Sequence, residues 1–369
     1  MFEFSKGCDY LKRNLGIDLL RLTLMFMVVI LHILGHGGIL NSAIPFSANY
    51  IVAWLIETAC YCAVNCYAII TGYVYISSQY RPSSMITLWL HGLVYSLGLA
   101  ICAWIIKPDL FSLGGLFNFI LPVSRRIWWY LSAYAGLFII IPFLNAAVNA
   151  FSERHAKILV LCSLFTFTVL PTLSDVDYVS SGYGYSTFWL AYLYVIGAFI
   201  RKYHWGESLS AKKALLTYLA CVLVSWLWKL ATGYYASVLP EVIEGINFVS
   251  YTSPTIVFSA IALLLLFSKV SPSETGTAFI QAFSPAAFGV YLIHEHPYIS
   301  GKFIYDRFSW LNDFSSLTML LGIFMSAIVI FVLCILVDFI RVKIFQWLGI
   351  KKMLSRLDAV YSDVLSIHN

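Results

Sequence analysis

The sequence predicts an all-α polytopic membrane protein with about ten transmembrane helices and with both its N- and C-termini in the cytoplasm. Of its 369 residues, 60% are hydrophobic and only 11% are charged, and the mean hydropathy is +0.83. Apolar runs of about 20 residues, each long enough to cross about 30 Å of hydrocarbon, recur along the whole chain. A soluble domain of this size could not hide so much apolar surface in one core, which excludes that class of protein.

Ten apolar runs of this length are predicted to cross the membrane. The first follows Lys12 and Arg13, but it is too long and too polar for the apolar core of a signal peptide, so we interpret it as a retained helix. The spans are 17–37, 49–76, 85–106, 127–149, 156–174, 187–203, 211–235, 248–270, 278–299 and 315–345. They form one domain over 1–369, with cytoplasmic tails at about 1–13 and about 346–369.

The distribution of basic residues sets the predicted orientation. With the N-terminus in the cytoplasm, most of the 23 Lys and Arg residues, including Arg341, fall in inner segments, as the positive-inside rule requires. The outer loops 38–48, 175–186 and 236–247 contain no Lys or Arg. The excess of basic residues in cytoplasmic segments therefore explains the formal net charge of +5. A nucleic-acid partner is not needed to explain it.

Two outer segments carry further expectations. Residues 108–126 form a longer segment, in which 110–121 has the pattern of a short amphipathic helix in the membrane interface. The loop 175–186 is rich in Tyr, Ser, Gly and Asp, a mixture that suits stacking on sugars and hydrogen bonding to them. An ordinary polar connector has the same composition, and loop chemistry alone favours the connector.

The cysteines predict neither a metal site nor a disulfide. Cys60, Cys62 and Cys66 are closely spaced, but Glu57 is the only carboxylate or histidine near them in the sequence. Cysteine behaves as a small apolar residue inside helices. We therefore expect these thiols to be free and to bind no metal.

A polar stripe on the first apolar helix is the candidate active site. At about 100° per residue, His32 returns to within about 20° of Arg21, about 16 Å further along the helix axis. Asp18 lies one turn before Arg21, and His36 lies one turn after His32, where we expect it at the interface. Charged groups in a spanning helix cost several kcal/mol unless they are paired or face a wet cavity, so such residues usually mark a functional path.

A second polar cluster, His294, Glu295 and His296, is predicted near the outer end of the ninth span. Two interpretations remain open at this stage. The cluster lines the entrance for a substrate, or it satisfies the polar groups of a helix end beside Pro297.

Other polar residues have simpler expected roles. Glu57 is expected to face the outer leaflet or a partner, and the ammonium of Lys229 is expected to reach outward along its apolar stem. Arg125 and Arg126 are expected at the outer interface beside an aromatic belt. Gly72 is expected to permit close contact between two helices.

Several of these motifs together resemble the acyltransferase family 3 membrane proteins. Arg21, ten intervening residues and His32 resemble the signature of the family's opening helix, a basic residue followed at that spacing by a histidine. The further matching runs are Ile70 to Val74 at the end of the second span, Arg126 to Tyr134 and Pro142 to Asn145 around the fourth, and Tyr291 to His294 in the penultimate one. Many members have two arginines three residues apart after the second span, whereas here Arg81 is followed by Ser84.

The resemblance implies a membrane enzyme that transfers an acyl group, commonly acetyl, from cytoplasmic acyl-CoA to a hydroxyl. The acceptors implied are glycans of the bacterial cell surface or their lipid-linked precursors, and the location implied is the bacterial inner membrane. No permanently bound cofactor is implied: acetyl-CoA or another acyl-CoA is a co-substrate. The expected partners are therefore acyl-CoA, a glycan or lipid-linked saccharide, and membrane lipid.

Within that reaction, His32 is the expected general base, because an imidazole can take the proton of an attacking hydroxyl near neutral pH. Arg21 is expected to position the acyl-CoA through its planar fork of donors, with Asp18 paired to it. The residues expected to bind substrate are His294, Glu295, Arg81, Arg126 and Trp129. Direct transfer and an acyl-histidine intermediate remain open alternatives.

The competing hypothesis is a secondary transporter or proton-coupled exporter. Embedded Asp18, Arg21, His32 and Glu57 would suit one on composition alone. Inverted repeats would favour it, and the sequence contains no recognisable repeat. The sequence does not reveal which acyl group is transferred, which glycan accepts it, or the oligomeric state of the protein.

Overall fold

The computed structural model describes residues 14–78, 80–174, 176–238 and 247–366, and within these ranges the chain forms helices and no strands. The N-terminal tail with Lys12 and Arg13 lies outside the described residues. The helices are α1 (Leu15–Leu34), α2 (Ile39–Ser42), α3 (Ala48–Cys60), α4 (Ala63–Tyr75), α5 (Pro82–Ile106), α6 (Leu113–Ile120), α7 (Trp129–Ala150), α8 (Glu153–Leu164), α9 (Leu170–Ser174), α10 (Thr187–Lys202), α11 (Ala211–Val238), α12 (Pro254–Phe267), α13 (Glu274–Phe283), α14 (Ala287–His294), α15 (Pro297–Phe303), α16 (Ser316–Trp347) and α17 (Ile350–Ser366).

The described helices confirm the all-α membrane fold, although the number of long spans is smaller than predicted. Eight segments of the described residues are long and apolar enough to cross a membrane. The predicted spans 187–203 and 248–270 correspond to the shorter helices α10 and α12. α12 is short because turns occupy the residues before Ser253, and Pro254 starts the helix, where its missing N–H costs nothing.

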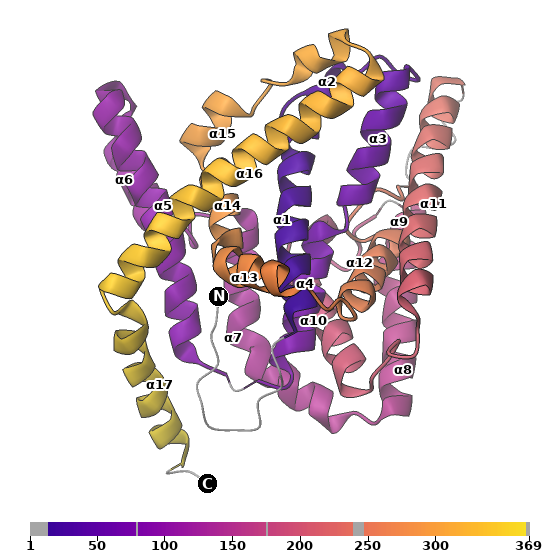
Figure 1. Ribbon diagram of the computed structural model, residues 1–369. Coiled ribbons are helices and arrows are strands. Elements are labelled where there is room, and N and C mark those ends of the chain that lie inside the picture. The colour runs from indigo at the N-terminus through magenta and orange to yellow at the C-terminus, as the bar shows by residue number, and fades with distance from the viewer. Residues whose placement is uncertain (1–13, 79, 175, 239–246, 367–369) are drawn as a thin grey trace.

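Helix α1 is the central element of the fold (Figure 1). It packs against α3, α4, α12, α14 and α16, and most of its side chains are buried. Its start is fixed by Asn14, whose side chain accepts a hydrogen bond from the Ile17 N–H as an N-cap. The polar stripe on α1 is therefore surrounded by other helices. Charged side chains in a spanning helix need such surroundings, because facing lipid would cost several kcal/mol.

Two predicted spans are broken helices. The second is interrupted at Tyr61 and Cys62, between α3 and α4, and the ninth is interrupted by a 3₁₀ turn at Ser284–Ala286. Non-helical backbone at membrane depth is tolerated where it is buried in protein or lines a cavity. Tyr61 lines the cavity described below, so the first break has that setting.

The predicted outer segment 108–126 contains a short helix, as expected. Helix α6 runs back along α5, because Ser96 in α5 donates a hydrogen bond of 2.7 Å to the carbonyl of Phe119 and Trp104 packs on both Phe111 and Phe119. The segment therefore returns the chain toward the start of α7.

The C-terminal tail also forms a helix, α17, which packs against α5. Its Asp358 accepts hydrogen bonds from the backbone N–H of Ser83 (3.0 Å) and from the Ser83 hydroxyl (2.6 Å). These bonds satisfy donors in the first turn of α5. The tail is thereby attached to the transmembrane part of the chain.

Gly72 in α4 and Gly197 in α10 face each other, which confirms the predicted close helix contact. A Cβ at Gly72 would overlap the carbonyl oxygen of Tyr194, and a Cβ at Gly197 would overlap that of Ile69. Small residues let two membrane helices approach until their backbones touch. This contact fixes α4, which contributes cavity residues, against α10.

We expect Gly72→Ala to destabilise the protein strongly, because the new methyl group meets rigid backbone and the two helices must separate. Overpacking of this kind costs about 1–3 kcal/mol or more. The measurement is the yield and the thermal unfolding temperature of the purified variant. Gly98→Ala is the matched control, because a Cβ there meets nothing within 4 Å. Equal stability of the two variants would contradict the assigned contact.

Candidate active site

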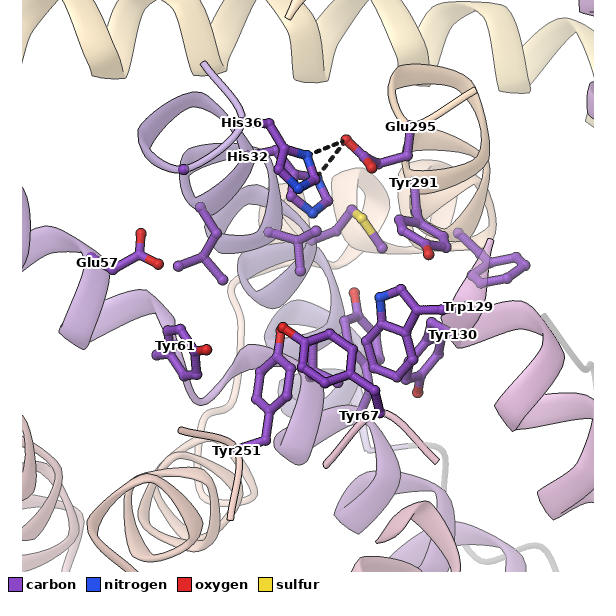
Figure 2. A pocket seen from close by; sticks show the side chains of 17 residues that line it. His32, His36, Glu57, Tyr61, Tyr67, Trp129, Tyr130, Tyr251, Tyr291 and Glu295 are labelled. Atoms are coloured by element: carbon purple, nitrogen blue, oxygen red, sulfur yellow. Dashed lines mark hydrogen bonds and ion pairs between the residues drawn. The ribbon is translucent and has the colours of Figure 1, made fainter. Parts of the chain in front are cut away.

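A cavity of about 260 Å³ lies beside α1 at the position of the predicted stripe. It is enclosed by α1, α3, α4, α7, α14 and the segments that precede α10 and α12 (Figure 2). Met25, Val28 and His32 contribute from α1, and His36 contributes from the turn that follows it. They recur every three or four residues, so a single face of α1 supplies this wall. The other lining residues are Leu31, Gly35, Glu57, Tyr61, Val64, Tyr67, Trp129, Tyr130, Tyr185, Tyr251, Phe288, Tyr291 and Glu295.

His32 and His294 form a hydrogen-bonded pair whose partners assign the ring protons. His294 Nδ1 lies 2.6 Å from the carbonyl oxygen of Val290, and because a carbonyl only accepts, Nδ1 carries the hydrogen. In the neutral imidazole, His294 Nε2 then holds a lone pair. His32 Nδ1 lies 2.8 Å from that atom and is therefore the donor. His32 Nε2, which makes no hydrogen bond within the described part of the chain, is left as the basic nitrogen.

Glu295 joins the histidines of α1 to the end of α14. Its Oε1 lies 3.2 Å from His32 Nδ1 and 3.3 Å from His36 Nδ1. The His32 and His36 rings stack with centroids 4.9 Å apart and an interplanar angle of 2°, and His36 also stacks on Tyr305. The carboxylate is thus placed to balance a positive charge on either imidazole. His36 is also part of the cavity wall.

The second polar cluster is divided between two functions. His294 is the last residue of α14 and Glu295 is its C-cap, and both side chains meet His32. His296 Nε2 donates to the carbonyl of Ser96 in α5 (3.1 Å), and its Nδ1 accepts from the Tyr298 N–H at the start of α15. His296 therefore joins helices and does not line the cavity.

Aromatic side chains form the wall below the histidines. Trp129 lies 4.6 Å from Tyr185 and 6.1 Å from Tyr251, and Tyr61 lies 4.9 Å from Tyr251, measured between ring centroids. Figure 2 shows Tyr61, Tyr251 and Trp129 on the side of the cavity opposite His32. Trp129 is one of the predicted substrate-binding residues, and the structure places it in the cavity.

Tyr185 belongs to the loop for which loop chemistry alone favoured an ordinary connector, and its side chain lines the cavity. Asp177 organises this loop by accepting hydrogen bonds from the Ser181 N–H and hydroxyl, both at 2.7 Å, and from the Gly182 N–H at 2.6 Å. Partial burial opposes them, but these bonds hold the pKa of Asp177 below its ordinary value. Gly184, with φ of 95°, lets the loop backbone touch Tyr251.

Glu57 projects into the same cavity, contrary to the expectation that it faces lipid or a partner. Its exposed fraction is 7%. Its Oε2 is buried and has no hydrogen-bond partner among the described residues. Periodicity could not show this, because it gives the face of α3 on which Glu57 lies but not what packs there. A usable signal was Tyr61, which follows Glu57 by one helical turn on that face.

Arg21 and Asp18 are paired as predicted, but they lie outside the cavity lining. Arg21 Nη1 is 2.8 Å from Asp18 Oδ1. The hydroxyl of Tyr67, a lining residue, donates to the backbone carbonyl of Arg21. Tyr67 also packs on Tyr130, with ring centroids 6.4 Å apart. These two aromatic side chains therefore lie where the cavity ends toward Arg21.

Arg81 and Arg126 do not reach the cavity. Arg81 is the residue before α5, and Arg126 is exposed in the loop between α6 and α7, where its φ of 51° is left-handed. Neither lines the cavity. The assignment of these two residues to substrate binding is therefore not supported by a position in this site.

A buried ion pair that sequence analysis missed supports α14. Arg341, predicted in an inner connecting segment, is 8% exposed inside α16, and its Nε and Nη2 bond the two oxygens of Asp338 at 2.7 and 2.8 Å. Its Nη1 lies 2.7 Å from His91 Nε2 in α5. Asp338 packs against Gly289, where a Cβ would overlap the carboxylate. The spacing of three residues between Asp338 and Arg341 was the signal available.

The ligand atoms of His32, His294 and Glu295 lie within 4.8 Å of one another, a grouping that could hold a metal ion. The 2.8 Å between the two imidazole nitrogens is the length of a hydrogen bond. The expectation of no metal, which was drawn from the cysteines alone, stays a prediction. Cys60, Cys62 and Cys66 are free thiols.

Comparison with known proteins gave one match. A family model described as an acyltransferase domain matches residues 14–339, which include every cavity residue. No curated protein and no solved structure matches the chain.

Proposed function

Because the chain belongs to the acyltransferase family that this model describes, we propose that it transfers an acetyl group from cytoplasmic acetyl-CoA to a hydroxyl of a glycan. The acceptor is a bacterial cell-surface glycan or its lipid-linked precursor, and the enzyme works in the bacterial inner membrane. The observation that carries this proposal is the arrangement of His32, His294 and Glu295, which leaves a basic imidazole nitrogen beside an aromatic cavity.

The proposed transfer needs a positioned base, because the pKa of a sugar hydroxyl lies far above neutrality. His32 Nε2 takes the hydroxyl proton while the hydroxyl oxygen attacks the thioester carbonyl. The new carbon–oxygen bond forms and the carbon–sulfur bond breaks. The proton then passes from the imidazolium to the departing sulfur, which leaves as the thiol of coenzyme A.

Glu295 supports this cycle electrostatically. When His32 is protonated, its Nδ1–H faces the carboxylate at 3.2 Å, so the charge formed during attack is paired in place. His294 fixes the ring orientation through the bond to His32 Nδ1. An acyl-histidine formed at His32 Nε2 would use the same geometry, and both chemical routes remain within the proposal.

Arg21 is proposed to hold the acyl-CoA on the inner side of the cavity. It lies about 16 Å from His32 along α1, which is a distance suited to the pantetheine arm of the coenzyme, and Asp18 fixes its guanidinium. The arm would pass the side chains of Tyr67 and Tyr130, which must move aside.

We expect Arg21→Gln to raise the Michaelis constant for acetyl-CoA at least tenfold, because loss of a charge-assisted hydrogen bond costs about 1.5–3 kcal/mol. The Michaelis constant for the acceptor should change little. The measurement is initial rate against each substrate in lipid nanodiscs. Arg201→Gln is the matched control, because Arg201 bonds Tyr73 away from the cavity. A change confined to the acceptor constant would remove Arg21 from donor binding.

The function itself is tested by label transfer. The purified protein in nanodiscs is incubated with radiolabelled acetyl-CoA and with lipid-linked surface glycan from its host. Label on the glycan with the wild-type protein supports acetyl transfer. Folded protein that transfers label from none of several acyl-CoA donors would contradict the proposal and favour the transporter hypothesis.

A further inference from the structure

Glu57 is a buried carboxyl group that the proposed chemistry does not use. It points into the cavity from α3, while Glu295 lies on the other side of His32 (Figure 2). Glu295 is paired with two imidazoles, whereas the ion pairs found among the described residues do not include Glu57. Burying a carboxylate without a partner is costly, so a carboxyl group in this position is held uncharged. An uncharged carboxyl group in a cavity wall can donate a hydrogen bond to a ligand hydroxyl and accept one from it.

The wall beside Glu57 is suited to the flat, apolar face of a saccharide ring. Tyr61 follows Glu57 by one turn, and Tyr251, Tyr185 and Trp129 continue the same surface. Aromatic rings offer a large apolar area with little conformational entropy to lose, and the polar edge of a sugar then requires hydrogen-bonding groups at the rim. Glu57 and His32 are such groups, on adjoining sides of the cavity.

The charges around the cavity select against an anion. Among the described residues that line it, none is Lys or Arg. Lys229 in α11 places its ammonium 4.2 Å from the centroid of the Trp54 ring, and it is not a lining residue. Lys302 and Arg307, on the outer side, are exposed, and Arg307 Nε donates to the Lys302 carbonyl. A carboxylate that entered the cavity would lose water without gaining a cation.

We propose that Glu57 is a hydrogen-bonding residue of the acceptor subsite. It bonds a hydroxyl of one saccharide ring stacked on Tyr61, Tyr251 and Trp129, and the lining, which holds no Lys or Arg among the described residues, excludes rings that carry a carboxylate. This inference rests on the proposed function for its assignment of the cavity to the acceptor. It adds to that function a substrate class, the uncharged saccharide ring, and a residue that binds it.

Equilibrium binding tests this inference separately from acetyl transfer. The probes are octyl β-glucoside and octyl β-glucuronide, which share ring and tail and differ in the carboxylate. Saturable binding of radiolabelled octyl glucoside to the full chain in nanodiscs is measured, with each glycoside as competitor. The wild-type protein is expected to bind the glucuronide at least tenfold more weakly. Equal affinities, or no saturable binding of the glucoside, would overturn the inference.

Two substitutions test the hydrogen bond assigned to Glu57. Glu57→Gln keeps a donor and an acceptor of the same shape, so the affinity for the glucoside should stay within about threefold of the wild-type value. Glu57→Ala removes the hydrogen bond, so glucoside binding should weaken about five- to tenfold. Glu274→Ala, at an exposed position at the start of α13, is the matched control and should retain the wild-type affinity. An unchanged affinity for the glucoside in folded Glu57→Ala would overturn the role of Glu57. Failure of the proposed function would appear instead as absent acetyl transfer to host glycan.

Discussion

Replacing His32 with alanine is expected to lower the turnover number for acetyl transfer by about 10²–10⁴-fold, the usual contribution of a positioned general base. The expectation follows from the proton assignment, in which the Val290 carbonyl and the His294 ring leave His32 Nε2 as the basic atom. The measurement is single-turnover transfer of radiolabelled acetyl in nanodiscs. Because binding is measured separately, a loss in turnover can be distinguished from a loss in affinity.

The control for this substitution is His155→Ala, which removes an exposed histidine at the start of α8. Its turnover should match that of the wild-type protein. His32→Gln adds a second test, because glutamine preserves a side-chain hydrogen-bonding group but supplies no comparable base. Substantial turnover by folded His32→Ala would remove the residue from proton transfer and leave the cavity as a binding site alone.

Much of the fold followed from apolar runs, because each run long enough to cross the bilayer must be helical. Helical periodicity also identified the face of α1 that carries Asp18, Arg21 and His32, and the small size of Gly72 identified it as a contact residue. These are properties of one helix at a time. The helix breaks at Tyr61 and Ser284 were not predicted, because the apolar sequence continues through them and only tertiary contacts make a break tolerable there.

The candidate site was predictable only in part for a related reason. A single helix shows which residues share a face, but it does not show which residue of another helix completes the site. The sequence placed His36 at the interface, Glu57 facing lipid or a partner, and Tyr185 in a connecting loop. None of these assignments requires a contact with a particular residue of another helix. Packing placed all three in the cavity wall. Conversely, Arg81 and Arg126 belong to segments matched through the family resemblance, and their positions lie away from the cavity.

The second large effect is expected at Glu295. Glu295→Gln retains an oxygen that can accept from His36 Nδ1, but it removes the charge that balances the imidazolium formed at His32 during attack. A loss of about 10–100-fold in turnover is expected, since hydrogen bonds to charged groups are worth about 1.5–3 kcal/mol. Affinity for the donor should be little changed, because Arg21 lies beyond the cavity and Glu295 does not contact it.

A double substitution separates this electrostatic role from a merely structural one. If Glu295 acts through His32, its substitution should cost little further turnover in a chain that already carries His32→Ala, because residues that act as a unit are strongly non-additive. If Glu295 only caps α14, the two losses should multiply, since effects on independent features add as free energies. Multiplying losses, with the unfolding temperature lowered by Glu295→Gln alone, would therefore contradict the charge-balancing role. If the double variant instead has the same turnover as His32→Ala, the carboxylate of Glu295 and the imidazole of His32 act together in the same catalytic step.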